Sequence, residues 1–377
     1  MSPGSIAYLD NAATTPLHPE ALAAMLPFLG DRFGNPSGVH AMARDARAAL
    51  EEARDVAADC LGARPGEVVF TGGGTEADNL AITGVHGRCG GTVVCPASEH
   101  HAVLHTAATV GGRVVPVGPD GIVDLDALAG ALDDDVTVVS VMLANNEVGT
   151  IQPLGQIAEV VRTHAPNAVL HTDAVQAFPW LDVTSLAAPA QLVAVSAHKF
   201  GGPKGVGALV VRDGVDVDPV IHGGGQERDR RSGTHNVAGI VGMAAAMRVT
   251  VDMRARTVER VGGLRDRLAD GLIAGVPGTR ETGDRRTKVA GNCHLRFEGI
   301  ESEALLILLD DAGVCASAGS ACTSGAIEPS HVLTAMGIDA ADALSSVRLS
   351  LGPTTTDDDV DLALKVVPEA VARLRGR

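Results

Sequence analysis

The sequence predicts an α/β fold in which a mostly parallel sheet lies between helices, followed by a smaller α+β lobe. Three observations predict it. Short valine-rich runs are apolar at both odd and even positions, as strands buried on both faces are. Longer amphipathic stretches, such as residues 154–164, alternate with these runs. After about residue 250 the order changes to a long helix, a strand and two further helices.

The elements follow in order along the chain. A helix over residues 40–61 comes before the sheet. In the second lobe we predict a strand near residues 289–297, a helix near 301–311 and a final helix from Asp357. Ligands of open α/β sheets bind at the C-terminal ends of the strands, so polar residues there are the candidates for function. The predicted sheet strands cover residues 67–71, 92–95, 137–143, 168–173, 191–196 and 206–211.

Composition excludes several classes of protein. The chain has 377 residues, and 46 acidic against 30 basic residues give a formal charge of -16. A polyanion would be repelled, so we expect no nucleic-acid partner held by bulk electrostatics. No apolar run approaches the roughly 18 residues of a membrane span, and no secretory signal is visible. Six scattered cysteines without a CxxC pair predict a reducing, cytoplasmic compartment.

A glycine-rich turn follows the predicted strand 67–71. Gly72, Gly73, Gly74 and Thr75 lead into a helical run. Glycines allow close approach of a ligand, and a helix start offers unpaired N–H groups to a phosphate. The alternative is an ordinary strand-to-helix turn, because the pattern is neither GxGxxG nor a P-loop.

Two further candidates stand at strand ends. Asp173 ends the strand 168–173, where its carboxylate could hold a proton on a heterocyclic nitrogen, and the alternative is a helix N-cap. Lys199 follows the strand 191–196 and is one of only four lysines among the 30 basic residues. Partial burial would make its amine a nucleophile for a carbonyl, whereas a snorkelling surface lysine is the alternative.

Histidines follow the predicted strand 92–95. His101 and His105 could bind a metal from one helix face, but no third ligand is near, so we predict no metal. His100 could instead lie against a flat cofactor ring or move protons. Small polar residues around Cys322 predict an exposed loop with a reactive thiol, or else an unimportant loop cysteine. The other five cysteines lie in or beside apolar runs, which predicts that they are inert packing residues. Arg348, alone in an apolar stretch, could clamp a substrate carboxylate or form a structural ion pair.

The order of these signals matches the needs of one cofactor. Pyridoxal phosphate (PLP) requires a phosphate cradle, a stacking ring, a partner for the ring oxygen, a carboxylate for the pyridine nitrogen and a lysine. The chain supplies them in the order Thr75, His100, Asn146, Asp173 with Gln176, and Lys199.

The chain resembles the cysteine desulfurases, the NifS/IscS-like branch of the fold-type I PLP enzymes (class-V aminotransferases). The resemblance covers nearly the whole chain. It rests on ten collinear motifs: YLDNAATT (8–15), NPSGVH (35–40), TGGGTEADN (71–79), SEHHAV (98–103), LANNEVGTIQP (143–153), HTDAVQ (171–176), SAHKFGGPKGVG (196–207), HGGGQERDRRSGTHN (222–236), GSACTSG (319–325) and SVRLSLG (346–352).

The resemblance implies a role for each matching residue. Lys199 resembles the Schiff-base lysine, His100 the ring-stacking acid/base and Cys322 the persulfide-forming nucleophile. Asp173 resembles the partner of the pyridinium nitrogen. The remaining roles implied are phosphate binding by Gly74, Thr75, Ser196 and His198, with Thr234 reaching the phosphate of the other subunit, ring-oxygen binding by Asn146 and Gln176, and substrate-carboxylate binding by Asn35 and Arg348.

The resemblance also implies an architecture and an activity. It implies a large PLP-binding domain over residues 16–259 with a seven-stranded sheet, and a small domain from residues 1–15 and 260–377. It implies a cytoplasmic homodimer that converts L-cysteine to L-alanine and passes sulfur from Cys322 to an acceptor protein. Iron–sulfur cluster assembly, tRNA thiolation and DNA phosphorothioation all remain open. A selenocysteine lyase, or another PLP-dependent lyase or aminotransferase, is the alternative activity.

Overall fold

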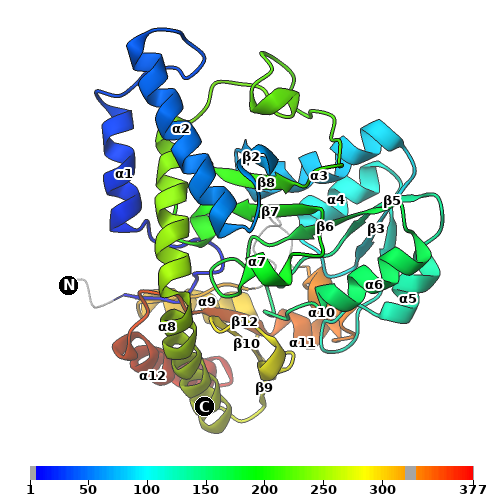
Figure 1. Ribbon diagram of the computed structural model, residues 1–377. Coiled ribbons are helices and arrows are strands. Elements are labelled where there is room, and N and C mark those ends of the chain that lie inside the picture. The colour runs from blue at the N-terminus through cyan, green and yellow to red at the C-terminus, as the bar shows by residue number, and fades with distance from the viewer. Residues whose placement is uncertain (1–5, 319–327, 377) are drawn as a thin grey trace.

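The computed structural model describes residues 6–318 and 328–376 of the chain (Figure 1). Cys322 lies outside these described residues, so its predicted role stays a prediction. A seven-stranded sheet and a three-stranded sheet, each with its own helices, make up most of the fold.

The large sheet confirms the predicted mostly parallel arrangement. Its strand order is β2-β8-β7-β6-β5-β3-β4, and every neighbouring pair is parallel except the two pairs that β8 forms with β2 and β7. The strands are β2 (Val68–Thr71), β3 (Thr92–Pro96), β4 (Arg113–Val115), β5 (Val136–Ser140), β6 (Val169–Asp173), β7 (Leu192–Ser196) and β8 (Gly207–Val211).

Six of these strands match the individual strand predictions, and two differences have physical reasons. β4 was not located because it is an edge strand of three residues whose Val114 is exposed, so it lacks the pattern of a strand buried on both faces. The prediction over residues 137–143 runs past the end of β5 at Ser140. The apolar run continues there because Val141 and Leu143 stay buried and still donate backbone hydrogen bonds beside β6.

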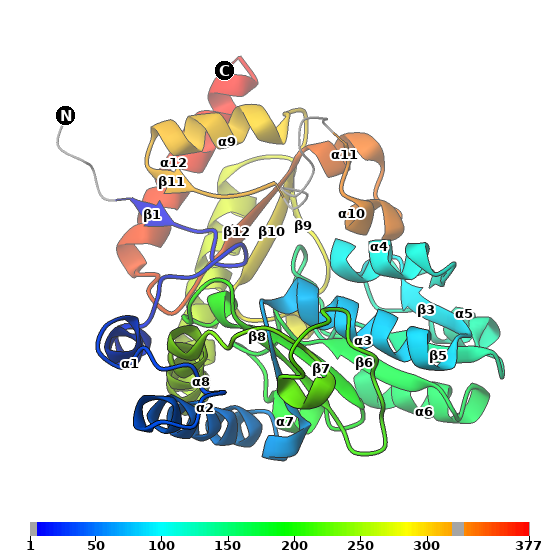
Figure 2. The ribbon, with the colours of Figure 1, turned by 90° about the horizontal axis from the view of Figure 1, so that it is seen from above.

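Alternate strand positions pack against different helices, as the pleat requires. Val69, Val93 and Leu209 belong to one apolar cluster with α3 and α4. Val68 and Leu170 belong to another, with helices on the opposite face. Figure 2 shows this layered arrangement. The helices around the sheet are α1 (Pro19–Leu29), α2 (Ala41–Cys60), α3 (Gly74–Cys89), α4 (His101–Thr109), α5 (Leu125–Ala131), α6 (Leu154–His164) and α7 (Val183–Leu186).

One long helix, α8 (Val237–Gly275), connects the two sheets (Figure 1). It begins 13 residues before the long helix predicted after residue 250, where the Asn236 side chain caps it by accepting the N–H of Gly239. The predicted domain boundary between residues 259 and 260 falls inside this continuous helix. The division of the chain at that point therefore stays a prediction.

The second sheet is antiparallel, in the order β12-β10-β9. The predicted final helix begins at Asp357 as expected, with Thr356 as its cap. The N-terminal segment joins this part of the fold, since β1 pairs with β11 and Asp10 bridges to Ser350. The elements are β1 (Ala7–Tyr8), β9 (Thr279–Glu281), β10 (Asn292–Phe297), α9 (Ser302–Asp311), β11 (Val314–Cys315), α10 (His331–Ala335), α11 (Ala340–Leu344), β12 (Ser346–Ser350) and α12 (Asp357–Leu374).

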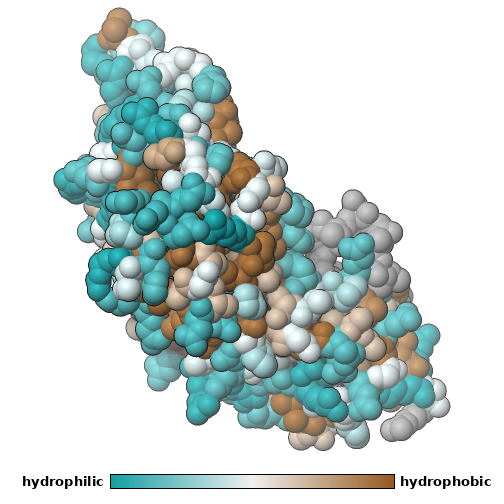
Figure 3. All heavy atoms as spheres, turned by 90° about the vertical axis from the view of Figure 1, so that its right-hand side faces the viewer, coloured by the Kyte–Doolittle hydropathy of each residue, from teal (hydrophilic) through white to brown (hydrophobic). Residues whose placement is uncertain are grey.

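Among the described residues, no helix combines the length and the apolar character that crossing a membrane requires. Hydrophilic and hydrophobic residues are interspersed over the face seen in Figure 3.

Candidate active site

The ends of two neighbouring parallel strands bring the main predicted side chains together. β6 ends at Asp173 and β7 ends at Ser196, and the strands pair with Asp173 opposite Ala194. Lys199 closes a short 3-10 helix, η2 (Ala197–Lys199), that directly follows β7. Burial raises the pKa of the Asp173 carboxyl, and the charge of Lys199 opposes this rise, which requires the two groups to lie near each other.

Asp173 is a buried carboxyl group with few partners. Its Oδ1 accepts the N–H of Val175 at 2.8 Å. Residues 175–180 form turns, so no helix begins there and the N-cap alternative is wrong. Burial raises the pKa of Asp173 to about 6, although the Val175 N–H and Lys199 oppose the rise. A second cation beside this carboxyl, such as a protonated ring nitrogen, would favour its ionised form.

Lys199 points toward the N-terminal segment of the chain. Its Nζ donates to the carbonyl oxygens of Ala12 at 2.6 Å and Ala13 at 2.9 Å. The segment is fixed in place because the N–H and the hydroxyl of Thr15 both donate to the carbonyl of His198. An amine held by two backbone carbonyls does not fit the snorkelling alternative.

Glycines form a close-packed cradle beside β7. α3 begins at Gly74, and the first N–H groups of a helix have no partner within the helix. A Cβ at position 74 would stand 2.7 Å from Cγ2 of Val175, and a Cβ at position 207 would stand 2.7 Å from the carbonyl carbon of Gly73. Gly73 itself has φ 147°, a conformation open to glycine. Ser196 lies at this cradle, with Oγ 3.7 Å from where a Cβ of residue 73 would be.

Two more predicted phosphate ligands, Thr75 and His198, lie on α3 and directly after β7. Thr75 is exposed on the first turn of α3. His198 places Nδ1 3.2 Å from Oγ1 of Thr14. Burial, with the charge of Lys199, lowers the pKa of His198 to about 4, so its ring is neutral near pH 7.

His100 caps α4, and its Nδ1 accepts the N–H of Ala102 at 3.1 Å. Burial and then the charge of Lys199 lower the pKa of His100 to about 4. The imidazole is therefore neutral near pH 7 and able to accept a proton. The neighbouring His101 stacks on His105 with ring centroids 4.8 Å apart. Among the described residues, no cluster of three or more His, Cys, Asp or Glu has metal-site geometry.

Two amide residues occupy the loops around Asp173. Gln176 is buried, and its Oε1 has no hydrogen-bond partner among the described residues. Such an orphaned polar atom calls for a ligand or an ordered water. Asn146 is half-buried, and its carbonyl accepts Nη1 of Arg348 at 2.9 Å.

Arg348 lies on β12 and reaches across to the site from the second sheet. Its Nη2 lies 3.0 Å from Oδ1 of Asp10, so the structural ion pair that the sequence left open is present. Its Nε is buried without a partner within the described part of the chain. One donor of the guanidinium thus stays unused.

Asn35 and Thr234 are both exposed, on the loops that precede α2 and α8. Oδ1 of Asn35 accepts the N–H of Ser37. The segment that carries Thr234 docks on α3, where Arg231 pairs with Glu76 at 2.8 Å. The structure places both residues on the surface, so their roles at the site stay predictions.

Sequence reasoning missed a buried acidic cluster behind Asp173. Asp78 and Glu99 are almost completely buried, and Oδ1 of Asp78 and Oε2 of Glu99 accept no hydrogen bond among the described residues. Burial, with the neighbouring carboxyls, raises both pKa values well above the usual range. His171 lies 3.6 Å from Asp78 and contacts Ser140 through Nδ1 at 2.8 Å. These residues lie inside the quoted motifs, but no sequence signal marks them as buried together.

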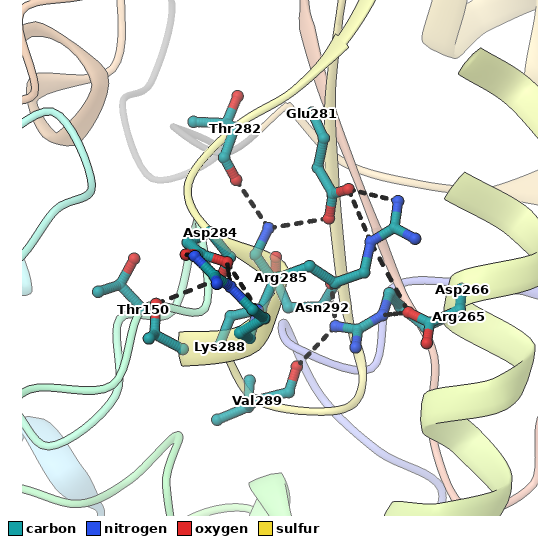
Figure 4. Close-up of polar contacts among 12 residues, drawn as sticks. Thr150, Arg265, Asp266, Glu281, Thr282, Asp284, Arg285, Lys288, Val289 and Asn292 are labelled. Carbon is teal, nitrogen blue, oxygen red and sulfur yellow. Dashed lines mark hydrogen bonds and ion pairs between the residues drawn. The ribbon is translucent and has the colours of Figure 1, made fainter. Parts of the chain in front are cut away.

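Sequence reasoning also missed the connection between the second sheet and the site loop. Lys288 is fully buried; its Nζ donates to Oε1 of Glu281 at 3.2 Å and to the carbonyl of Thr282 at 2.7 Å (Figure 4). The same residue bridges to Thr150 in the loop that carries Asn146. This ion pair therefore fixes the loop against β9 and β10.

The described cysteines are free thiols, and they differ in exposure. Cys60, Cys95 and Cys293 are buried, which fits the predicted packing role. Cys315 is half-buried, and Cys89 is exposed at the end of α3. The prediction that all five are inert packing is therefore wrong for Cys89.

Comparison with known proteins gives one consistent result. The family described as "Aminotransferase class-V" matches residues 7–363. An IscS-like cysteine desulfurase of Mycobacterium tuberculosis is 48% identical, over 98% of this chain and 97% of its own length. A cysteine desulfurase IscS of Methanosarcina thermophila is 45% identical, over 98% and 92%.

Solved structures agree with these relatives. A NifS-like protein superposes with a TM-score of 0.92 at 36% identity, covering 98% of this chain and all of the other. The structure of DndA from Streptomyces lividans superposes with a TM-score of 0.76 at 34% identity, covering 91% and 99%.

Proposed function

Because this chain belongs to the class-V aminotransferase family, we propose that it is a PLP-dependent cysteine desulfurase that converts L-cysteine to L-alanine. One observation carries the proposal: a buried carboxyl group, Asp173, and the amine of Lys199 share a site at the ends of neighbouring strands. The glycine cradle at Gly74 supplies the third requirement, an anion site.

The residues present fit PLP. Gly74, Thr75, Ser196 and His198 would hold its phosphate, and Asp173 its ring nitrogen. The orphaned Oε1 of Gln176 and the cradle that a Cβ would fill support this fit. When bound, PLP withdraws electrons from the substrate Cα. The remaining contacts would come from Asn146 with Gln176 at the ring oxygen, His100 over the ring and a covalent bond from Lys199.

Proton transfer falls to two of the chain's own groups. His100 is neutral near pH 7, and because its Nδ1 accepts the N–H of Ala102, the proton of the ring is on Nε2. His100 would therefore donate a hydrogen bond from Nε2, and it would take up a proton at Nδ1 when the bond to Ala102 opens. The amine of Lys199 would carry the Cα proton. Arg348 would bind the substrate carboxylate through the guanidinium whose Nε is unused, together with Asn35.

The sulfur would move to Cys322. Its thiolate attacks the substrate sulfur, so that a new S–S bond forms, the Cβ–S bond breaks, and the carbon skeleton leaves as alanine after protonation. A solved structure titled "SspA in complex with cysteine" superposes on this chain with a TM-score of 0.80 at 32% identity, which supports cysteine as substrate. A homodimer, in which Thr234 reaches the phosphate of the other subunit, and a sulfur-acceptor protein complete the proposal.

The test separates cofactor binding from sulfur transfer. Purified protein loaded with PLP and given L-cysteine should form alanine. Cys322→Ser should keep the visible absorbance of the bound cofactor and form no alanine. Lys199→Ala should lose the covalently held cofactor. Cys89→Ser is the matched control, because it removes an exposed thiol far along α3 and should change neither property. A wild-type alanine rate in Cys322→Ser would rule out sulfur transfer through that thiol.

A further inference from the structure

A cavity of about 840 Å³ lies beside the predicted cofactor site. Its walls come from the N-terminal segment, the turn after β6, the middle of α8 and the loop after β12. Lys199 and Gln176 contribute to its wall, whereas Asp173, His100 and Arg348 do not. Its volume falls within the roughly 300–1,000 Å³ of small-molecule sites. The cavity thus adjoins the predicted cofactor site and shares Lys199 and Gln176 with it, while the rest of its lining is separate.

The charge of this cavity is opposite to that of the chain. Acidic residues outnumber basic residues in the protein, which has a formal charge of -16. The cavity instead has four basic residues, Lys199, Arg254, Arg256 and Arg260, and two acidic residues, Glu20 and Glu259. Such a local reversal of charge concentrates anions.

Arg254 is a basic residue of the cavity wall that has no carboxylate partner among the described residues. Its guanidinium lies over the ring of Phe178, and its Nε and Nη2 are buried with no hydrogen-bond partner among the described residues. Burial lowers its pKa; the charge of Asp182 opposes this, but no described carboxylate lies within ion-pair distance of Arg254. Arg260 differs, because it donates to the carbonyls of Pro353 and Thr355. Nη1 is the guanidinium nitrogen of Arg254 that is neither buried nor hydrogen-bonded within the described residues, so an anion in the cavity would meet Arg254 at Nη1.

The rest of the wall is apolar and aromatic. Trp180 is only 7% exposed, and its ring packs so closely on Gly291 that a Cβ there would stand 2.3 Å from Cζ2. Phe200 and Met253 line the cavity with it. A ligand that pairs with Arg254 would therefore bring an apolar or aromatic body against Trp180.

We propose that this cavity binds a small organic anion, with its carboxylate or phosphate on Arg254 and its apolar body against Trp180. The proposal does not depend on the desulfurase reaction. It adds a second ligand site whose wall includes the backbone turn of Lys199, so the ligand would lie next to the catalytic lysine.

Trp180 is the only tryptophan of the chain, so its fluorescence reports on this cavity alone. The probes are 4-nitrobenzoate, 4-nitrophenyl phosphate and neutral 4-nitrobenzyl alcohol, whose nitro groups quench tryptophan on contact. The lifetime of Trp180 is measured in PLP-loaded protein, so that no probe enters the cofactor site. We expect saturable quenching by at least one anion, with the alcohol at least about tenfold weaker. The tighter of the two anions identifies a carboxylate or a phosphate as the preferred group.

Variants test the proposed contact. Arg254→Met should raise the dissociation constant of the anion at least about tenfold. Arg248→Met, on the same helix but paired with Asp59 on the surface, is the matched control and should leave it unchanged. Thr257→Phe, which fills the cavity, should abolish quenching, so the proposal stays testable if Arg254→Met folds poorly. Equal affinity for anion and alcohol, unchanged affinity in Arg254→Met, or binding only in PLP-free protein would each overturn the proposal.

Discussion

Two clusters of buried ionisable groups, one beside each of the two larger sheets, differ in whether their charged groups have partners of opposite charge. Behind Asp173 in the large sheet, Asp78 and Glu99 have carboxyl oxygens with no hydrogen-bond partner among the described residues. In the second sheet, Glu281 pairs with both Lys288 and Arg285 (Figure 4). The first cluster holds acids without cations, and the second matches each charge with its opposite.

The difference indicates that the cluster behind Asp173 belongs to the candidate active site, whereas the Glu281 cluster has a structural role. Burial raises the pKa values of Asp78 and Glu99, which favours their protonated forms, and an added cation such as a ring nitrogen would favour the ionised form of Asp173. The paired cluster leaves no charge for a ligand and only fastens β9 to the loop that carries Asn146. Four predictions test this contrast, from the largest effect to the smallest.

Glu281→Gln should destabilise the protein by about 3–5 kcal/mol, because it leaves the buried ammonium of Lys288 without a carboxylate. Lys288→Met should cost far less, since Glu281 keeps its pair with Arg285. The free energy of unfolding in urea measures both. Equal losses in the two variants would show that the charges are not matched as described.

Asp78→Asn should increase the free energy of unfolding near pH 7, measured by urea titration, and should make stability less dependent on pH above the unfolded pKa of aspartate. The raised pKa of Asp78 means that the folded state binds its proton more tightly than the unfolded state does. Its contribution to stability is therefore present below the unfolded pKa and lost as pH rises. Asparagine, which never ionises, removes that loss. A destabilised variant at pH 7 would contradict the raised pKa of Asp78.

For His171 we expect a smaller effect on stability, and this effect appears as pH falls, whereas that of Asp78 appears as pH rises. Burial lowers its pKa from 6.5 to about 3, so the unfolded state binds a proton that the folded state does not. The wild type should lose about 0.8 kcal/mol from this group by pH 6, with further loss down to about pH 3. His171→Asn should show a shallower loss between these pH values in urea titrations. Parallel curves for the two proteins would exclude the buried neutral imidazole.

Arg248→Ala should change stability by less than about 0.5 kcal/mol, because the ion pair with Asp59 is exposed on both sides and screened by water. It sets the baseline against which the buried clusters are compared. Thermal unfolding of the variant beside Glu281→Gln is the measurement, and a loss as large as that of Glu281→Gln would remove the contrast between buried and surface pairs.

Much of the fold follows from local pattern. Valine-rich runs located six of the seven strands of the large sheet, and the start of the last helix at Asp357 agrees with its capping residue Thr356. The edge strand β4 was not predicted because one of its faces is open to water, so it lacks the continuous apolar run of a buried strand. The N-terminal third of α8 was not predicted because its residues from Val237 to Met247, nine of which are buried, are all small or apolar and show no amphipathic period in the sequence.

The sequence by itself determined which chemical groups stand at the strand ends. Asp173 closes β6 and Lys199 follows β7 because strand patterns and the residues that end them are local. Only the tertiary structure decided what surrounds them. Arg348 meets Asp10 across 338 positions, and three separate segments bury Asp78, Glu99 and Asp173 together. Electrostatic energy depends on distance and burial in space, and these exist only after distant segments have packed.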